Sequence, residues 1–436
     1  MDRTTIGIIG VAVVLLMILL RVPVGIALGL VSIAGIFAIL GLTPALGAIT
    51  AIPFNFIGDW SLSAIPMFLL MGAIASKSEI TADLFQFMRM LLNRVPGGLA
   101  SASVGACALF SAASGSSLAT AGAMTRVAIP EMLRANYSPA LATGTVAAAG
   151  TLGSLIPPSI LMIIYGIFAE QSISMLFAAS FLPGVVSALL FVAMITTRSY
   201  LNPSIAPPDK TVYTSRQKLQ ALRGVWPFPL IIIAILGGIF SGIFSPTEAG
   251  AAGAFFALLL AMWRRTFSIR DFYNSLIDTA NTTASIFIIG IGAILFTRFM
   301  AIAGIPSYLS QALEPLIQEP TLLIIMIGIM FIILGMFVDS IGLLLLTLPI
   351  LLPIVKQADI NLIWFGVVAV KLLEIGMITP PLGLNVYVIK GAIGKAISLG
   401  TIFKGCYWFI VMDLLLFAAF IAFPSLVMFV PNLLMR

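Results

Sequence analysis

The chain has 436 residues, of which 61% are hydrophobic and only 9% are charged, and its formal net charge is +6. A soluble domain carries about 25% charged residues, and one soluble core could not bury so much apolar surface. The composition therefore predicts an all-α polytopic membrane protein. The chain contains no histidine, which excludes histidine proton relays, zinc sites built on histidine and Ser-His-Asp catalysis.

The basic residues are placed unevenly along the chain. If the chain starts outside and is threaded through its apolar runs, nearly all of the Lys and Arg residues fall in loops on the cytoplasmic side. This is the positive-inside pattern of membrane proteins, so the net charge reports orientation and not a nucleic-acid partner. At about 20 residues a crossing, the apolar runs predict ten or eleven crossings.

In chain order, two similar halves are expected. The first has apolar helices, an amphipathic arm, a re-entrant helical hairpin, a broken helix and one further helix, over 1–75, 76–97, 98–131, 138–170 and 171–200. A cytoplasmic linker rich in Pro, Lys and Arg follows over 201–226. The second half has apolar helices, an arm, a hairpin, a broken helix and a final helix, over 227–303, 304–320, 321–355, 361–391 and 401–436.

The two halves match at a constant offset of 223 residues, which places Gly153 and Pro157-Pro158 on Gly376 and Pro380-Pro381. Ser117 falls on Ser340 at the same offset. The threading gives the halves opposite orientations. Inverted repeats with interrupted helices at matching positions are typical of secondary transporters, whose binding site lies at the interruptions.

Each predicted hairpin has a tip of small or polar residues, Ser111–Ser117 in the first half and Gly335–Ser340 in the second. The legs, at about 12–15 residues, are too short to cross a bilayer alone. Non-helical backbone at membrane depth is tolerated only beside protein or a wet cavity. Small-residue helix packing is an alternative, but the duplication, together with Asp339 at the second tip, favours a binding site.

The two Pro-Pro pairs each lie inside an apolar segment and predict a broken helix. Proline removes a donor and clashes with the preceding turn, so the carbonyls before Pro157 and Pro380 lose their partners. A bound Na⁺, which suits oxygen ligands, could replace the lost hydrogen bonds. The alternative is a kinked helix in which a nearby Ser or Thr satisfies the free carbonyl.

Ionisable residues at membrane depth are functional candidates. Lys371 and Glu374 are three residues apart on one helix, so we expect them to pair with each other. Arg298 lies near a helix end and can extend its charge to the interface. Asp59 and Asp413 are interpreted as interfacial or helix-contact residues.

Four motifs resemble the large membrane subunit of the tripartite ATP-independent periplasmic (TRAP) transporters, and the resemblance covers essentially the whole chain. They are Phe110-Ser-Ala-Ala-Ser-Gly-Ser-Ser-Leu-Ala-Thr120, Gly153-Ser-Leu-Ile-Pro-Pro158, Gly335-Met-Phe-Val-Asp339 and Thr379-Pro-Pro-Leu-Gly-Leu-Asn385. The resemblance implies Na⁺-driven import of a small carboxylate, without ATP, across the bacterial inner membrane. It also implies a separate four-helix membrane subunit, a periplasmic substrate-binding protein, and an elevator-type transport domain that slides past a scaffold.

The resemblance further implies ligands for Na⁺ and for the substrate. One Na⁺ would bind at Ser111, Gly153, Ile156 and Pro158, and another at Gly335, Gly376, Thr379 and Pro381. The substrate would lie between the tips, at Ser114, Gly115, Ser116, Ser117, Asp339 and Ser340.

Other functions remain as alternatives. The closest is a stand-alone ion-coupled carboxylate or anion carrier without partner subunits. An intramembrane enzyme would need paired Asp, Ser-His or a metal motif, and the sequence contains none of these. A scaffold subunit without a transport path would not explain the duplicated broken segments. The Gly-x-x-x-x-Gly-Lys-[Ser/Thr] motif of ATPases is missing as well.

Overall fold

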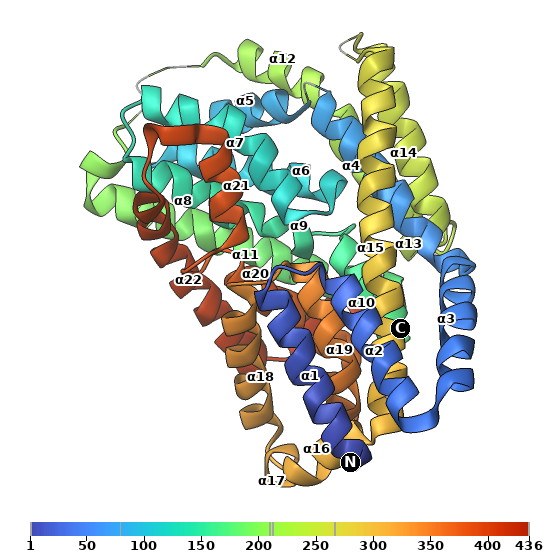
Figure 1. Ribbon diagram of the computed structural model, residues 1–436. Helices are drawn as coiled ribbons and strands as arrows, with labels where there is room; N and C mark the ends of the chain where they lie inside the picture. Colours follow the sequence, from blue (N-terminus) through green and yellow to red (C-terminus); the bar gives the residue numbers. More distant parts are fainter. Residues whose placement is uncertain (1, 79, 209–210, 212, 266, 435–436) are drawn as a thin grey trace.

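In the computed structural model, residues 2–78, 80–208, 211, 213–265 and 267–434 are described, so the last two residues of the expected final helix lie outside this part. Every regular element within these ranges is a helix, which confirms the predicted all-α class (Figure 1). The long apolar helices confirm the polytopic membrane class.

The first half of the chain runs from α1 to η2. Its helices are α1 (Arg3–Leu19), α2 (Val24–Leu40), α3 (Leu42–Ile57), η1 (Trp60–Ser63), α4 (Ala64–Lys77), α5 (Ile80–Leu92), α6 (Gly98–Ser114), α7 (Ser117–Arg134), α8 (Pro139–Gly150), α9 (Leu152–Leu155), α10 (Ile160–Ala169), α11 (Ile173–Leu201) and η2 (Pro203–Ile205).

The second half begins in the polar linker, which contains a helix of its own, and ends close to the C-terminus. Its helices are α12 (Ser215–Val225), α13 (Pro227–Phe240), α14 (Pro246–Trp263), α15 (Ile269–Ala303), α16 (Ile305–Ala312), α17 (Glu314–Ile317), α18 (Pro320–Gly335), α19 (Ser340–Gln357), α20 (Leu362–Gly376), α21 (Leu384–Ile393), η3 (Gly394–Ala396), α22 (Leu399–Ala422) and α23 (Ser425–Leu434).

Local sequence signals explain where several of these helices begin. Ser245 and Glu248 form a capping box at the start of α14, and Ser268 and Asp271 do the same for α15. Such reciprocal side-chain bonds satisfy backbone N–H groups that have no partner inside the helix. α15 then continues for 35 residues and runs the height of the molecule in Figure 1.

The number of helices that could span a membrane is lower than expected. By length and composition the described residues contain six, or up to eight if each of two bent helix pairs is one span. The expectation of ten or eleven was too high because α1, α2 and α3 have only 16 or 17 residues each. These helices are apolar but fall short of a full crossing at 1.5 Å per residue.

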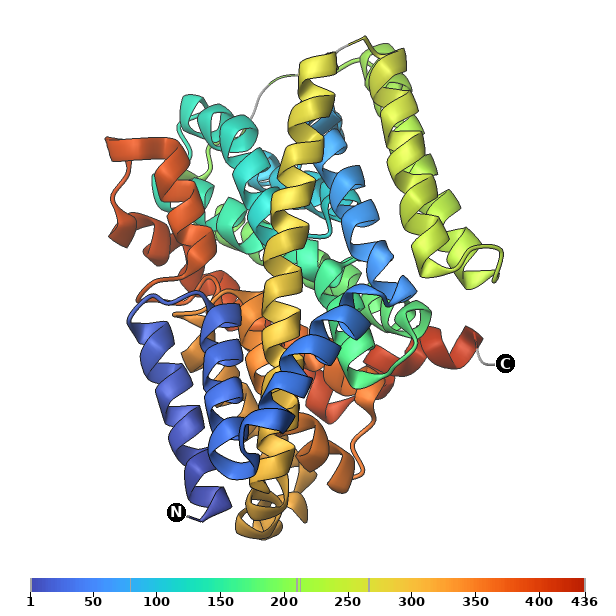
Figure 2. The same ribbon diagram turned by 45° about the vertical axis from the view of Figure 1, so that its right-hand side comes forward.

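Two helical hairpins lie in opposite halves of the molecule. The α6–α7 pair is in the upper half of Figure 1 and the α18–α19 pair is in the lower half, and the turned view in Figure 2 agrees. Their legs have 16 to 18 residues, not the 12–15 expected. The first legs stay helical into the tips, to Ser114 and Gly335, and each second leg continues through a proline, Pro130 or Pro353. Leg length therefore does not distinguish these hairpins from simple spans, and α19 is long and apolar enough to cross.

The core surrounds two broken helices that are buried on nearly all sides. In α8 every residue from Leu141 to Gly150 is buried, and in α20 every residue from Trp364 to Gly376 is buried. A helix that is apolar all round belongs in the interior of a bundle. The hairpin tips come to lie against these helices.

Candidate functional site

The two hairpin tips are held by local hydrogen bonds. In the first, Gly115 adopts a left-handed conformation (φ 58°) and its N–H donates to the carbonyl of Ser111 at 2.9 Å. The Ser116 hydroxyl accepts from the backbone of Ala119 and caps α7. In the second, the Asp339 carboxylate accepts from the N–H of Gly342 at 2.8 Å and caps α19. Both tips therefore present a helix N-terminus, which carries partial positive charge.

The two helix breaks lie where the Pro-Pro pairs predicted them. The chain unwinds after α9 and again after α20, and both Pro-Pro bonds are cis. At each break one hydroxyl replaces a lost hydrogen bond. Ser159 donates to the carbonyl of Ser154, and Thr379 donates to that of Ile375, both at 2.6 Å. At each break, one free carbonyl is therefore hydrogen-bonded by a nearby hydroxyl, as the alternative of a kinked helix predicted.

The first tip packs directly on the first break. A Cβ atom added to Gly153 would lie 2.6 Å from the carbonyl oxygen of Ser116, so only glycine fits there without a shift. One added to Gly115 would lie 2.9 Å from the Pro158 oxygen. The Ile160 N–H donates to the Gly115 carbonyl at 3.2 Å. These contacts join α6–α7 to α9–α10.

The second tip packs on the second break in the same way. A Cβ atom on Gly376 would lie 2.7 Å from the Gly335 Cα, and the Gly383 N–H donates to the Met336 carbonyl at 3.3 Å. The buried Asn385 side chain then donates to the carbonyl of Ala147 in α8 at 3.2 Å. The two tip-and-break units, which come from distant parts of the sequence, are therefore linked to each other.

A cavity of about 80 Å³ lies between the two tips. It receives polar side chains from both hairpins and both broken helices, and none of the described residues that line it is Lys or Arg. The lining residues are Leu69, Gly115, Ser116, Ser117, Leu118, Ser154, Ile160, Leu161, Thr282, Ile286, Asp339, Ser340, Ile341, Glu374 and Met377.

Five of the six residues expected at the substrate site line this cavity: Gly115, Ser116, Ser117, Asp339 and Ser340. The sixth, Ser114, shares a hydrogen bond of 2.7 Å with Thr120 and supports the tip from behind.

The residues expected to hold Na⁺ lie at the two breaks and, for Ser111 and Gly335, in the first helices of the hairpins; all are outside the cavity lining. The Ser111 hydroxyl is buried and has no hydrogen-bond partner within the described part of the chain. Thr379 is half-buried, Ile156 packs near Gly184 of α11, and Pro381 is exposed. The four residues expected at the first Na⁺ site are all buried, whereas the second site includes the exposed Pro381.

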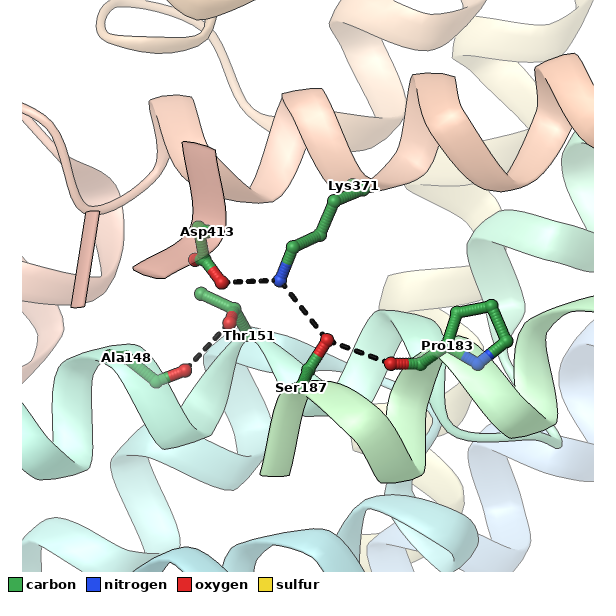
Figure 3. Close-up of polar contacts among 6 residues, drawn as sticks. All are labelled: Ala148, Thr151, Pro183, Ser187, Lys371 and Asp413. Carbon is green, nitrogen blue, oxygen red and sulfur yellow. Dashed lines mark hydrogen bonds and ion pairs between the residues drawn. The ribbon is translucent and has the colours of Figure 1, made fainter. Parts of the chain in front are cut away.

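The expected pairing of Lys371 with Glu374 is wrong. The Lys371 ammonium forms an ion pair with Asp413 of α22 at 2.5 Å and donates to Ser187 of α11 at 3.4 Å (Figure 3). Asp413 is fully buried, so it is a helix contact and not an interfacial residue. A spacing of three allows a pair on one helix, but here packing turns Lys371 toward α22.

Ser154, Thr282 and Glu374 are the polar cavity residues that were not expected at the substrate site. Glu374 is 1% exposed, and its Oε1 accepts a hydrogen bond from Ser340 at 3.2 Å. Ser154 donates to Ser117 at 3.4 Å. The charge of Glu374 at membrane depth made it a functional candidate, but its expected pairing with Lys371 kept it out of the substrate site. Ser154 and Thr282 carry no comparable signal.

Comparison with a solved structure defines the class of fold. The chain resembles the structure of MtrF of Neisseria gonorrhoeae with a TM-score of 0.62 at 17% identity, over 97% of this chain and 95% of that one. The two chains thus share an overall fold.

Comparison with known sequences gives the family. Residues 11–426 match the model of the tripartite ATP-independent periplasmic transporter, DctM component, and the chain belongs to this family. It is 32% identical over 416 residues to SiaM, the sialic acid TRAP transporter large permease protein of Vibrio cholerae, with 94% of this chain and 95% of that protein covered.

Two relatives are longer than this chain. It is 33% identical over 381 residues to SiaT, the sialic acid TRAP transporter permease protein of Haemophilus influenzae, with 86% of this chain covered. It spans 60% of the length of SiaT, and 60% of the isethionate TRAP transporter permease protein DctMQ of Oleidesulfovibrio alaskensis.

Proposed function

We propose that this chain is the large subunit of a Na⁺-driven importer of a small carboxylate. The observation that carries the proposal is the convergence of two hairpin tips and two broken helices on one polar cavity. Membrane transporters bind substrate and ions at such interrupted helices near the bilayer midplane. The large permeases with sialic acid or C4-dicarboxylates in their names make a small carboxylate the substrate class to test first.

The coupling ions are proposed to bind at the two breaks. The first Na⁺ would use the free hydroxyl of Ser111 with the carbonyl oxygens of Gly153, Ile156 and Pro158. The second would use Gly335, Gly376, Thr379 and Pro381. The Thr379 hydroxyl donates its proton to Ile375, so its lone pairs remain free for a cation. Hard cations prefer such oxygen ligands.

The substrate carboxylate would bind between the tips, near Ser116, Ser117 and Ser340, where the N-termini of α7 and α19 favour negative charge. Because hydrogen bonds tie each tip to a break and Asn385 ties one broken helix to the other, hairpins and broken helices can move as one body. This supports an elevator mechanism with inverted repeats, in which 1–75 and 227–303 form the scaffold.

The working complex would contain a separate four-helix membrane subunit and a periplasmic substrate-binding protein, in the inner membrane of a bacterium. A liposome assay tests this directly. The chain is reconstituted with both partners, and uptake of radiolabelled sialic acid and C4-dicarboxylates is measured under an inward Na⁺ gradient. Uptake that ignores Na⁺ would refute the coupling. Uptake by the chain alone would favour a stand-alone carrier.

A further inference from the structure

The Glu374 carboxylate has an incomplete set of partners at the centre of the molecule. It lines the cavity between the tips and is 1% exposed. Ser340 donates to Oε1, but Oε2 has no hydrogen-bond partner among the described residues. A buried carboxylate is strongly unfavourable unless another group offsets its charge. No hydrogen bond from the described chain reaches Oε2, so a cation bound at this atom would offset the charge of the carboxylate.

The cation nearest to Glu374 along the chain is already engaged. Lys371, one helical turn earlier, binds Asp413 and Ser187 on the side facing α22 and α11 (Figure 3). The other acidic residue that lines the cavity, Asp339, adds a second carboxylate. The cavity is thus negative, and an anionic substrate placed in it would meet repulsion unless positive charge enters as well.

The oxygen atoms around Glu374 form a set suited to a hard cation. The hydroxyls of Ser117, Ser154 and Ser340 face its carboxyl group. These four side chains come from α7, α9, α19 and α20, so each hairpin and each broken helix contributes one side-chain oxygen group to this cluster. Hydroxyl and carboxylate oxygens are the ligands that hard cations prefer.

We propose that Glu374, Ser117 and Ser154 bind a further Na⁺, in addition to those at the two breaks, and that Ser340 holds the carboxylate in place. This cation neutralises Glu374 and offers positive charge to the carboxylate of the substrate. The inference rests on the proposed function for the nature of the substrate, but not for the cation itself. Ser117 would bind the cation and Ser340 binds Glu374, so the occupied site would connect the two hairpin tips through the Glu374 carboxylate.

The test measures Na⁺-dependent thermal stabilisation of the purified chain in detergent, with choline chloride keeping ionic strength constant. Glu374→Gln preserves the shape of the side chain and removes its charge. We expect it to raise the Na⁺ concentration for half-maximal stabilisation by about tenfold or more, equivalent to about 1.4 kcal/mol. Glu319→Gln, at an exposed position before α18, is the matched control and should behave as wild type.

Ser154→Ala is a second variant that leaves all charges in place, and it should weaken Na⁺ stabilisation in the same direction. In the liposome assay, Glu374→Gln should lower the Hill coefficient for Na⁺ by about one. If Glu374→Gln and Ser154→Ala both respond to Na⁺ as Glu319→Gln does, the site does not exist. If Glu374→Gln is simply more stable and wild type ignores Na⁺, a proton neutralises Glu374 and the proposal is overturned.

The two proposals can fail separately. Wild-type uptake that ignores Na⁺ would refute the proposed function, while the thermal measurement on the isolated chain would still decide the Glu374 site. Normal Na⁺-driven uptake by the Glu374→Gln variant, with an unchanged Hill coefficient, would refute the Glu374 site alone.

Discussion

The buried ion pair between Lys371 and Asp413 gives the sharpest prediction about stability. Both side chains are at most 2% exposed, and their charged atoms are 2.5 Å apart. Lys371→Met keeps the length of the side chain but leaves Asp413 charged, with an Oδ2 atom that already has no partner among the described residues. Removing one member of a buried pair costs about 3–5 kcal/mol, against about 0–1 kcal/mol for a surface pair.

Asp413→Leu should destabilise by a similar amount, because Lys371 then keeps only Ser187 at 3.4 Å and the face of Phe191 at 5.6 Å from its ring centre. The double variant Lys371→Met/Asp413→Leu removes both charges and should lie within about 2 kcal/mol of wild type. The free energy of unfolding is measured from the loss of helical signal in mixed micelles with increasing SDS. A double variant that loses the sum of two large single effects would refute the reasoning, since uncoupled sites add.

Three further predictions concern the tips, the breaks and the surface. Gly153→Ala should cost about 1–3 kcal/mol in the same unfolding assay because its methyl group meets the first tip; Gly391→Ala, which meets nothing within 4 Å, is the control, and equal effects would contradict the contact. Thr379→Ala should weaken Na⁺ activation of uptake several-fold, by about 1 kcal/mol, and Thr379→Ser should restore it; full activity of the alanine variant would exclude a hydroxyl ligand. Asp83→Asn breaks a partly exposed ion pair with Arg264 and should cost less than about 1 kcal/mol; a larger loss of unfolding free energy would show that α5 depends on this contact.

The helix breaks were predictable from sequence because proline acts locally. Two consecutive prolines in an apolar segment interrupt a helix wherever it packs, and both breaks lie where Pro157 and Pro380 placed them. The ends of the hairpins, in contrast, could not be predicted from the positions of single prolines. The hairpins were expected to end at residues 131 and 355, yet α7 continues through Pro130 to Arg134 and α19 continues through Pro353 to Gln357.

The partner of Lys371 could not be read from the sequence because it depends on packing between distant helices. The spacing to Glu374 permits a pair within α20, whereas Asp413 lies 42 residues away on α22. A helix buried on all sides offers each of its faces to a different neighbour. The sequence shows which residues share a face, but only the assembled bundle shows what that face meets.

The two Pro-Pro pairs occupy matching positions but differ in their access to solvent. Pro157 and Pro158 are buried, whereas Pro380 and Pro381 are exposed. On the proposed function, an ion at the second break could exchange with the surrounding solution while an ion at the first stayed trapped. The two ions would then bind and leave in a fixed order, with the ion at the first break binding first and leaving last.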